Sequence, residues 1–424
     1  IVSAPVSGQN IKEFVENVNN NIRINGSVTP NQYAVSYYDD SQASGQKWKY
    51  YDVDYLVANP SETFEKGRSY AISRATDGVV TFTGTLETSD ITKSVATSEW
   101  NAIGNPYTTF LPVNENAGEN FIDDNTNKLD PAYIGVYIWD NTQDKYVGKS
   151  LVSSTSYLAP GQGFFVKTTS GVSDITFNQS QRKIQAETGG VFARGIKKTR
   201  PNIQLLASLK GITIDTNIKY FDNATEGLDP GYDLGNYGRS KFDVYTRLKG
   251  FESGEDFTIQ SLPTESIETT VLPIGLKAEL NDEITFSVKV TDLLDGVEVF
   301  IEDKKLRTLN KLNTEESYKV KTTEKINGIG RFYLHTRQSK VATIIEDINE
   351  VKIYTLDNNN LIIDGLSKGD FKLTLYAIHG VSVLTKTEKG TGKNIIPLPR
   401  LKTGIYIVKI NSELGEKSQK IMIK

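Results

Sequence analysis

The sequence has no cysteine in its 424 residues. This excludes disulfide bonds, thiolate metal sites and cysteine nucleophiles together. Histidine is nearly absent too, since His335 and His379 are the only two. A Ser-His-Asp triad needs one of them, but the chain has no Gly-x-Ser-x-Gly motif, and zinc needs three or four ligands. The sequence therefore indicates no reaction, and we predict a protein that is not an enzyme.

A strong charge of one sign is also lacking. Lys and Arg number 48 and Asp and Glu number 52, which gives a net charge of −4. This balance leaves no basic footprint for nucleic acid, so we predict no nucleic-acid partner. No apolar run approaches the length of a membrane span. The chain begins at Ile1 and not at Met, which leads us to expect a removed signal peptide or further protein upstream.

Short alternating runs dominate the sequence. Tyr (21) and Phe (17) are frequent, and Gly (34) outnumbers Pro (13). Each run is bounded by turn residues and predicts a strand. Strands are predicted at 79–86, 132–139, 163–168, 241–248, 283–290, 297–303 and 331–336. The clearest helical pattern is short, at residues 10–22. We therefore predict an all-β, multi-domain protein made of β-sandwich or jelly-roll-like modules.

Three units and a linker divide the chain in this interpretation. A β-rich module spans residues 1–187, and a polar, basic stretch follows it. A jelly-roll-like β-sandwich spans residues 203–337, and a linker at 338–350 leads to a last unit at 351–424.

The last unit has the clearest pattern, with seven short apolar runs. Glycines separate them, where turns often need a positive φ. These glycines are Gly365, Gly380, Gly392, Gly404 and Gly415. Residues 404–410 are apolar on both faces, which predicts a central strand between two layers. In the final strand Ile421 and Ile423 share one face, opposite Met422. So many strands in so short a stretch predict a small Ig-like Greek-key sandwich.

The order of motifs in this unit resembles a known export signal. An apolar strand ends in Leu-Tyr, a Leu-Pro segment precedes Thr-Gly-Ile-Tyr-Ile-Val-Lys-Ile, and a glycine turn leads to a lysine-containing last strand. The unit is similar to the type A C-terminal sorting domain of the bacterial type IX secretion system. The matching positions are Leu375, Tyr376, Gly380, Leu398, Leu401, Gly404, Tyr406, Val408, Gly415, Lys420 and Lys424. Ala377 stands where the family usually has Asp.

The resemblance implies a route and a set of partners. An outer-membrane translocon would export the protein, and a shuttle barrel of the same system would bind the folded sorting domain. A sortase-like peptidase would cleave within 338–350 and join the product to surface lipopolysaccharide. The residues expected to be recognised are Tyr376, Gly380, Gly404, Tyr406, Val408, Gly415, Lys420 and Lys424. The protein would then be secreted or held on the surface of a Bacteroidetes-type bacterium. The alternative is an ordinary Ig-like adhesive module.

The first unit resembles a β-rich module that is common in surface proteins of the Bacteroidetes. It carries Trp-Asn-Ala-Ile-Gly-Asn-Pro-Tyr, Tyr-Ile-Trp-Asp and Ala-Pro-Gly-Gln-Gly-Phe-Phe-Val. No reaction follows from this resemblance. Trp100, Tyr137 and Trp139 are candidates for a glycan-stacking platform, because flat aromatic faces suit pyranose rings. The alternative, which we favour, places these three side chains in the core.

The second unit resembles a jelly-roll-like module of the same surface proteins. Asp222, Glu226, Asp229 and Asp233 lie close together in the sequence. Carboxylate and carbonyl oxygens on a loop suit Ca²⁺, although the spacing is not that of an EF-hand. The favoured alternative is an acidic turn closed by side-chain-to-backbone hydrogen bonds. Ca²⁺ is the one candidate cofactor that the sequence suggests, and we predict no other.

Two pairs of adjacent acids, Asp39–Asp40 and Asp123–Asp124, raise the question of a glycosidase. Neighbouring residues in a strand point to opposite faces, so we interpret both pairs as turn residues. The predicted function is therefore an exported protein with non-catalytic, adhesin-like or spacer modules. The alternative is a carbohydrate-binding accessory part of a larger secreted glycan-degrading enzyme.

Overall fold

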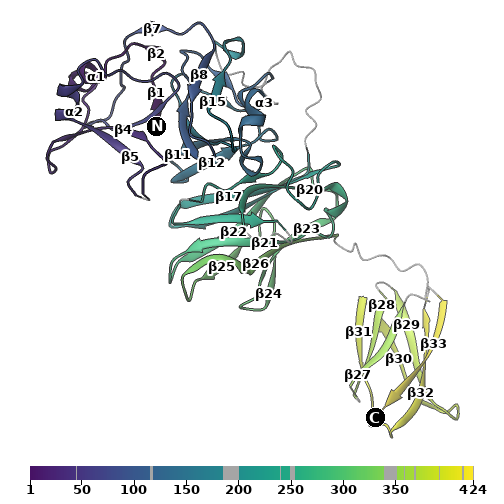
Figure 1. The fold of residues 1–424 in the computed structure, drawn as a ribbon. Helices are drawn as coiled ribbons and strands as arrows, with labels where there is room; N and C mark the ends of the chain where they lie inside the picture. The colour runs from purple at the N-terminus through teal and green to yellow at the C-terminus, as the bar shows by residue number, and fades with distance from the viewer. Residues whose placement is uncertain are drawn as a thin grey trace. The chain divides into compact units, whose positions relative to one another are not determined.

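The computed structural model describes residues 1–43, 45–114, 118–184, 200–238, 240–248, 254–338, 351–357, 359–366, 369–390, 392–412 and 415–423. The chain divides into two compact units, Ile1–Gln338 and Ser339–Lys424. We call them the N-terminal unit and the C-terminal unit. Both consist mainly of antiparallel strands (Figure 1), which confirms the all-β prediction. Within the described residues, no helix has the length and apolar character needed to span a membrane.

The first half of the N-terminal unit, residues 1–184, is assembled from several small sheets. The five-stranded sheet has the order β1-β6-β4-β3 with β5 paired to β4, and the four-stranded sheet has the order β12-β11-β14-β9. Three two-stranded ribbons, β2-β7, β8-β15 and β10-β13, complete it. The strands are β1 (Val2–Ser3), β2 (Val6–Ser7), β3 (Ile24–Asn25), β4 (Gln32–Tyr38), β5 (Trp48–Asp52), β6 (Ser69–Ile72), β7 (Thr85–Leu86), β8 (Ile91–Ser94), β9 (Trp100–Gly104), β10 (Leu111–Pro112), β11 (Val136–Asp140), β12 (Lys145–Lys149), β13 (Tyr157–Leu158), β14 (Gly163–Lys167) and β15 (Asp174–Phe177). The helices are α1 (Ile11–Glu16), α2 (Val53–Ala58) and α3 (Phe121–Asn125).

Helix α1 is shorter than the pattern at 10–22 predicts. Asn10 caps it by accepting a hydrogen bond from a backbone amide at 3.0 Å, and the helix ends at Glu16. The side chain of Asn17 then accepts from the backbone amide two residues on, at 2.9 Å. Such local side-chain bonds compete with the helix. Val18 is consequently 86% exposed, so the prediction was wrong beyond Glu16.

The predicted strand at 79–86 is also mostly absent, since only Thr85–Leu86 forms β7. Side-chain amides take the place of a strand partner here. Asn20 accepts from the Thr81 amide at 2.8 Å, and Gln9 accepts from the Thr83 amide at 2.6 Å. At 132–139 the first residues form a 3-10 turn instead, because Asp130 caps Pro131–Tyr133.

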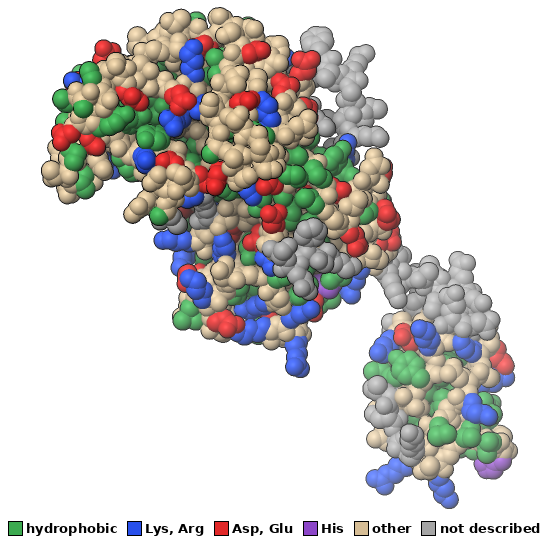
Figure 2. All heavy atoms as spheres, in the orientation of Figure 1, with side chains coloured by type: hydrophobic (Ala, Val, Ile, Leu, Met, Phe, Trp, Pro, Cys, Tyr) green, Lys and Arg blue, Asp and Glu red, His purple; other side chains and the backbone are tan. Residues whose placement is uncertain are grey.

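The second half of the N-terminal unit, residues 200–338, is one continuous sheet. Its strands run in the order β24-β23-β26-β21-β19-β20-β17-β16-β22-β25, with β18 paired to β20. The terminal strands of this path, β24 and β25, touch each other, so the sheet curls around a single core (Figure 1). Figure 2 shows Lys and Arg side chains gathered at that end. The strands are β16 (Asn202–Leu209), β17 (Ile212–Phe221), β18 (Leu234–Gly235), β19 (Asp243–Arg247), β20 (Asp256–Pro263), β21 (Val271–Ala278), β22 (Glu283–Thr291), β23 (Val297–Asp303), β24 (Thr308–Leu312), β25 (Tyr318–Lys321) and β26 (Ile326–Gln338).

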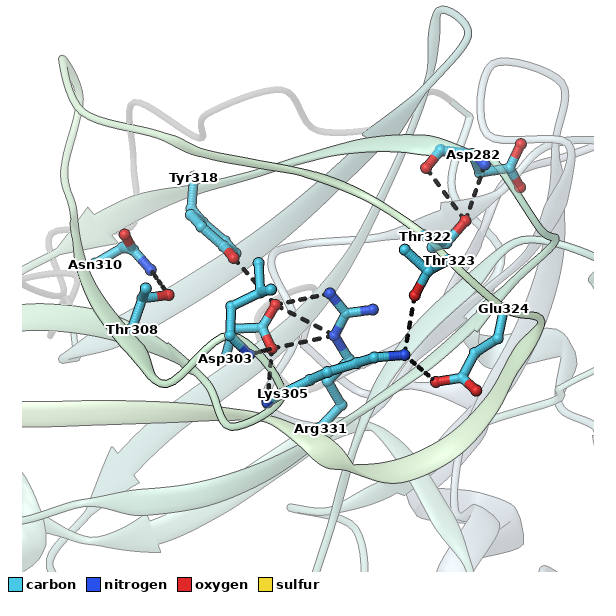
Figure 3. A network of polar contacts seen from close by, with 11 residues as sticks. Asp282, Asp303, Lys305, Thr308, Asn310, Tyr318, Thr322, Thr323, Glu324 and Arg331 are labelled. Atoms are coloured by element: carbon cyan, nitrogen blue, oxygen red, sulfur yellow. Dashed lines mark hydrogen bonds and ion pairs between the residues drawn. The ribbon is translucent and has the colours of Figure 1, made fainter.

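A buried ion pair joins β23 to β26 near this end (Figure 3). Arg331 contacts both carboxylate oxygens of Asp303, with Nε–Oδ1 at 3.1 Å and Nη2–Oδ2 at 2.8 Å. The Tyr318 hydroxyl donates to the same carboxylate at 3.0 Å. Burial alone would raise the pKa of Asp303, but these hydrogen bonds and one from a backbone amide hold it below its usual value. The neighbouring Lys305–Glu324 pair is exposed.

The two halves share one hydrophobic cluster, which we call the junction cluster. Its buried members are Tyr38, Ala102, Ala132, Tyr133, Tyr137 and Phe165 from the first half, and Leu234 and Ile259 from the second. The predicted boundary between 187 and 203 falls mainly outside the described residues, and the division into two modules stays a prediction. The shared cluster shows that the halves are packed together as one body.

Glycines make this close approach possible. A Cβ on Gly135 or Gly148 would lie 2.7 Å or 2.5 Å from a methyl carbon of Leu234. A Cβ on Gly235 would lie 2.3 Å from the ring of Tyr133. Real Cβ atoms do not tolerate contacts this short, so these positions need glycine for space.

The C-terminal unit is a two-sheet sandwich with the orders β27-β28-β31 and β30-β29-β32-β33. The inner faces of both sheets form one core. All the predicted strands are present, and the chain crosses between the two sheets three times, after β28, after β30 and after β31. The strands are β27 (Lys352–Asp357), β28 (Asn360–Leu366), β29 (Asp370–Ala377), β30 (Ser382–Lys389), β31 (Gly392–Pro397), β32 (Gly404–Ser412) and β33 (Gly415–Ile423).

Strand β32 lies between β29 and β33, which confirms its central position. Only one of its faces lies in the core, however, since Tyr406 and Val408 are buried while Ile405 and Ile407 are half-buried. The expectation of a layer on each face was wrong. Gly380, Gly392 and Gly415 have positive φ, as predicted, whereas Gly404 does not. Gly365 also has positive φ but lies inside β28, where the pairing with β31 shifts register, and not at a turn.

Candidate functional site: a C-terminal export signal and an aromatic pocket

The last strand, β33, is anchored by two side chains. Ile421 and Ile423 are 6% and 2% exposed, whereas Met422 between them is 60% exposed. β33 pairs with β32 along its whole length, from Ser412↔Gly415 to Gly404↔Ile423. The predicted facing of this strand is therefore confirmed.

Most positions of the sorting motif serve the sandwich itself. Leu375 and Val408 are fully buried and lie opposite each other across β29 and β32. The hydroxyl of buried Tyr406 donates to the Lys402 carbonyl at 2.9 Å and so fixes the entry to β32. Gly380 makes the turn after β29 at φ +87°, and its amide donates to the carbonyl three residues earlier at 2.8 Å. These residues build the shape that a partner would recognise.

Fewer of the motif positions reach the surface. Tyr376 is half-buried and Lys420 is exposed, and Lys424 lies outside the described residues. Leu398 and Leu401 belong to the core or pack against it. Gly415 begins β33 at φ +116°. Of the described positions, Tyr376 and Lys420 therefore offer the most side-chain surface to a partner.

A pocket of about 510 Å³ opens in the N-terminal unit where its two halves meet. We call it the junction pocket. It takes residues from β5, β11 and β12 of the first half and from the segment between β18 and β19 of the second. The lining residues used below are Trp48, Trp139, Lys145, Tyr146, Asn236, Tyr237 and Asp243. Its volume is in the range of small-molecule sites.

One wall of the junction pocket is aromatic. Trp139 and Tyr146 are direct neighbours across the β11–β12 hairpin, with ring centroids 5.1 Å apart. Tyr237, from the other half, packs against Tyr146 at 5.0 Å. Trp48 packs against Phe165 of the junction cluster at 6.2 Å. The rings are therefore held in place by their neighbours, and their orientation is fixed before any ligand arrives.

The junction pocket also has polar lining residues. Lys145 and Asp243 form an ion pair at 3.5 Å, and their side chains are only 5% and 2% exposed. Asn236 donates to the second oxygen of Asp243 at 2.8 Å. The Lys145 ammonium also contacts the Asp215 carbonyl at 3.4 Å. Both contacts of the ammonium are long, so its hydrogen-bonding capacity is only partly used.

The structure separates the three predicted glycan-stacking residues. Tyr137 is fully buried and its hydroxyl donates to the Gly235 carbonyl at 2.7 Å, so it has no face for a sugar. Trp100 is half-buried, with its ring centroid 4.5 Å from that of Tyr237 and 5.0 Å from that of Tyr137. Tyr137 is a buried member of the junction cluster, and Trp100 packs against that cluster. Trp139, at 37% exposure, lines the junction pocket.

Sequence reasoning missed the other lining residues. Tyr146 had a local signal, because the turn at 141–144 places it opposite Trp139 in a hairpin. Tyr237 and Asp243 had none, because they reach the pocket from the second half. Their placement depends on the junction cluster.

The four acids of the predicted calcium loop do not converge on a site. Asp229 accepts from a backbone amide of its own loop at 2.7 Å, and Asp233 accepts from the amides of Asp229 and Ser261. Burial raises the pKa of Asp233 to about 7, which makes it a poor ligand near neutral pH. In the part of the chain that the structure describes, no three His, Asp or Glu side chains, Asp222 and Glu226 included, gather as a metal site. The hydrogen-bonded turn accounts for the loop.

The remaining candidates for chemistry are also engaged elsewhere. His335 contacts Glu302 at 2.9 Å across the β23–β26 pair, and His379 lies exposed at the turn beside Gly380. Asp39 and Asp40 follow β4 as predicted turn residues.

Asp123 and Asp124 lie in helix α3 and not in a turn, which corrects that expectation. The Asn120 side chain caps the helix by accepting from the Asp123 amide at 3.0 Å, and Gln181 donates to Asp124 at 2.8 Å.

Two models of known protein families match parts of the chain. A family model described as secretion system C-terminal sorting domain matches residues 355–424. A model described as domain of unknown function (DUF8693) matches residues 1–335, across both halves of the N-terminal unit. No curated protein matches the chain. Because the second model covers most of the chain, the protein belongs to that family.

The sorting-domain match confirms the resemblance seen in the sequence. The protein is cargo of the type IX secretion system, and its C-terminal unit interacts with that machinery. It is a secreted or cell-surface protein. The family of the N-terminal unit carries no assigned activity.

Proposed function

We propose that the N-terminal unit is an exported, non-catalytic, adhesin-like module that binds its ligand in the junction pocket. The observation that carries this proposal is the pocket itself, which is lined both by packed aromatic rings and by a buried ion pair. Such a site suits recognition, because its side chains are oriented before binding. The C-terminal unit supplies the export signal. No metal or other cofactor takes part in the proposed binding.

The finer steps of export belong to the same proposal. The outer-membrane translocon would carry the chain, and a shuttle barrel would bind the folded C-terminal unit. A sortase-like peptidase would then cleave between the two units, within 338–350, and could join the product to lipopolysaccharide. The sequence resemblance supports these steps. The cleavage segment, apart from Gln338, lies outside the described residues.

Export is tested by a fusion of residues 338–424 to a fluorescent reporter that carries a signal peptide. The fusion is expressed in a type IX-competent host and in a sibling strain that lacks the translocon. We expect reporter on the surface or in the medium of the first strain only. Reporter retained in the periplasm of both strains would mean that this unit is not sufficient for export.

Binding is tested separately with the purified chain. The chain is incubated with intact bacteria, host cells and insoluble polysaccharides, and the retained fraction is measured. Retention on cell surfaces supports an adhesin. Retention on plant or algal polysaccharide alone would favour the second candidate function, a carbohydrate-binding accessory part of a glycan-degrading enzyme. The exposed side chain of Trp139 is the observation that supports this candidate. Retention on none of these surfaces would contradict the proposal.

A further inference from the structure

We propose that the junction pocket binds one ring of a neutral pyranose saccharide, stacked on Trp139 and hydrogen-bonded by the Lys145–Asp243 pair. This inference rests on the proposed binding function and names its ligand class. It depends on the two chemically distinct groups of lining residues, aromatic and polar, and on how each is held.

The aromatic wall fits the apolar face of a sugar ring. A pyranose presents C–H groups on its faces and hydroxyls around its rim. Trp139 keeps 37% of its surface exposed although it packs against Tyr146 at 5.1 Å. Its indole nitrogen already donates to Asn141 at 2.6 Å, which fixes the ring further. An aromatic ring that is both exposed and immobilised loses little side-chain entropy on stacking.

The polar side fits hydroxyl groups better than charged groups. A hydroxyl both donates and accepts, whereas an ammonium only donates and a carboxylate only accepts. Lys145 and Asp243 stand 3.5 Å apart, so one hydroxyl can accept from the first and donate to the second. Lys145 and the Val244 amide already contact Oδ1 of Asp243, at 3.5 and 3.1 Å, and Asn236 donates to Oδ2 at 2.8 Å. Since each carboxylate oxygen has two acceptor sites, one site on Oδ2 remains for a ligand hydroxyl.

The charges of the described lining residues favour a neutral ligand. The buried pair sums to zero, since one ammonium faces one carboxylate. At the rim, exposed Asp144 and Lys241 also balance each other. Among the described lining residues no surplus cation offsets the Asp243 carboxylate, so desolvating an anionic sugar beside it would cost binding energy.

The pair is also difficult to explain as a stabilising element. Burying two charges costs free energy that an ion pair recovers only with close geometry and further hydrogen bonds. Here the Lys145 contacts lie at 3.4 and 3.5 Å, whereas the Asp303–Arg331 pair in the same unit has contacts of 2.8 and 3.1 Å. A ligand hydroxyl would complete the coordination of Lys145.

The experiment uses the full chain and its intrinsic fluorescence. Trp48, Trp100 and Trp139 are the only tryptophans, and two of them line the pocket, so ligand binding should change their emission. The probes are cellobiose, maltose, laminaribiose, mannobiose and galactobiose, with digalacturonic acid as the anionic comparison. Heats of binding are measured by calorimetry in parallel. We expect saturable binding of at least one neutral disaccharide and weaker binding of the acid.

Three variants locate the site. Trp139→Ala should weaken binding by about ten- to hundredfold, the usual effect of removing one stacking ring. Trp139→Phe should retain most of the affinity, which separates stacking from misfolding. Tyr55→Ala removes an exposed ring outside the pocket and should change nothing.

Other results would overturn the inference. These are no saturable binding of any neutral probe, binding unchanged by Trp139→Ala, or preference for the acid. If the chain is retained on cells but binds no neutral disaccharide, the adhesin-like function stands and the ligand class proposed here is wrong. If both measurements fail, the binding function itself is wrong.

Discussion

The C-terminal and N-terminal units both bury the faces of their sheets, but the contacts that do so join residues at different separations in the sequence. In the C-terminal unit three hairpins, β27–β28, β29–β30 and β32–β33, join strands that follow each other in the sequence, and only the pairs β28–β31 and β29–β32 reach further, by at most about 40 positions. In the N-terminal unit the decisive contacts are distant, such as the hydrogen bond from Tyr137 to Gly235, which spans 98 positions. One unit is set by local alternation, and the other by a cluster assembled from far apart.

The two units also differ in how they use charge. The ion pairs described in the C-terminal unit are exposed, for example Lys409–Glu416. The N-terminal unit buries Asp303–Arg331 and Lys145–Asp243. Exposed pairs contribute little to stability, whereas losing one partner of a buried pair is costly. The units should therefore respond very differently to single substitutions and to acid.

The largest effect should follow from Arg331→Met, which leaves Asp303 buried without its partner. We expect a loss of about 3–5 kcal/mol in the free energy of unfolding. The pKa of Asp303 is lowered in the folded state, so its contribution is complete above the unfolded pKa of about 3.9 and is lost as pH falls through the folded pKa. Urea unfolding, followed by tryptophan fluorescence, should show the greatest difference from wild type near neutral pH and a smaller one in acid.

Lys305→Ala is the matched control for this prediction. Its partner Glu324 is exposed in the same part of the sheet (Figure 3), so the urea midpoint should hardly move. A difference between Arg331→Met and wild type that stayed constant with pH would show that lost packing, and not the ion pair, explains the effect.

A smaller effect should follow from Ile421→Ala in the C-terminal unit. The side chain is 6% exposed and fills the core beneath β33, so its truncation should cost about 2–5 kcal/mol. Met422→Ala, one residue on but 60% exposed, should stay within about 0.5 kcal/mol. Hydrogen exchange of the β32 and β33 amides measures both. Equal protection in the two variants would show that β33 is not anchored through this face.

The contrast between local contacts in the C-terminal unit and long-range contacts in the N-terminal unit explains which features of the fold could be predicted from the sequence. In the C-terminal unit every strand was predicted, because alternation and turn glycines such as Gly380 and Gly415 are local signals. The error there was a layer over the outer face of β32, since Ile405 and Ile407 are half-buried without a second sheet. Apolar residues at a surface are ordinary, and the pattern does not say what covers them.

In the N-terminal unit the errors and omissions come from long-range contacts. The strand predicted at 79–86 is replaced because Gln9 and Asn20 satisfy its backbone amides. Tyr137 and Trp139 are two residues apart in β11 and so share one face of the strand. Tyr137 is nevertheless buried by Leu234 and Gly235, while Trp139 reaches the junction pocket. No local signal distinguishes the two residues. The sorting motif was predicted from the sequence, and the junction pocket was visible only through Trp139.

Gly235→Ala tests whether the halves of the N-terminal unit unfold together. The new Cβ would lie 2.3 Å from the Tyr133 ring, so we expect a loss of about 1–3 kcal/mol from overpacking at the junction. Gly227→Ala is the matched control, because its nearest neighbour is Thr225 Oγ1 at 3.5 Å. Hydrogen exchange of the β11 and β17 amides, measured against urea concentration, should show one shared unfolding transition in wild type and two in Gly235→Ala. Two transitions in wild type would mean that the halves are independent modules.

The smallest effect isolates a single local hydrogen bond in the C-terminal unit. Tyr406→Phe keeps the buried ring but removes the bond to the Lys402 carbonyl at 2.9 Å, which should cost about 0.5–1.5 kcal/mol. Tyr354→Phe, at a 38% exposed position in β27, should cost less and serves as the control. Both are measured by exchange of the β32 amides. Because the bond spans only four residues, its loss should loosen the start of β32 and leave β29 and β30 protected. Loss of protection across the whole sheet would show that this unit, like the junction of the N-terminal unit, depends on more than its local contacts.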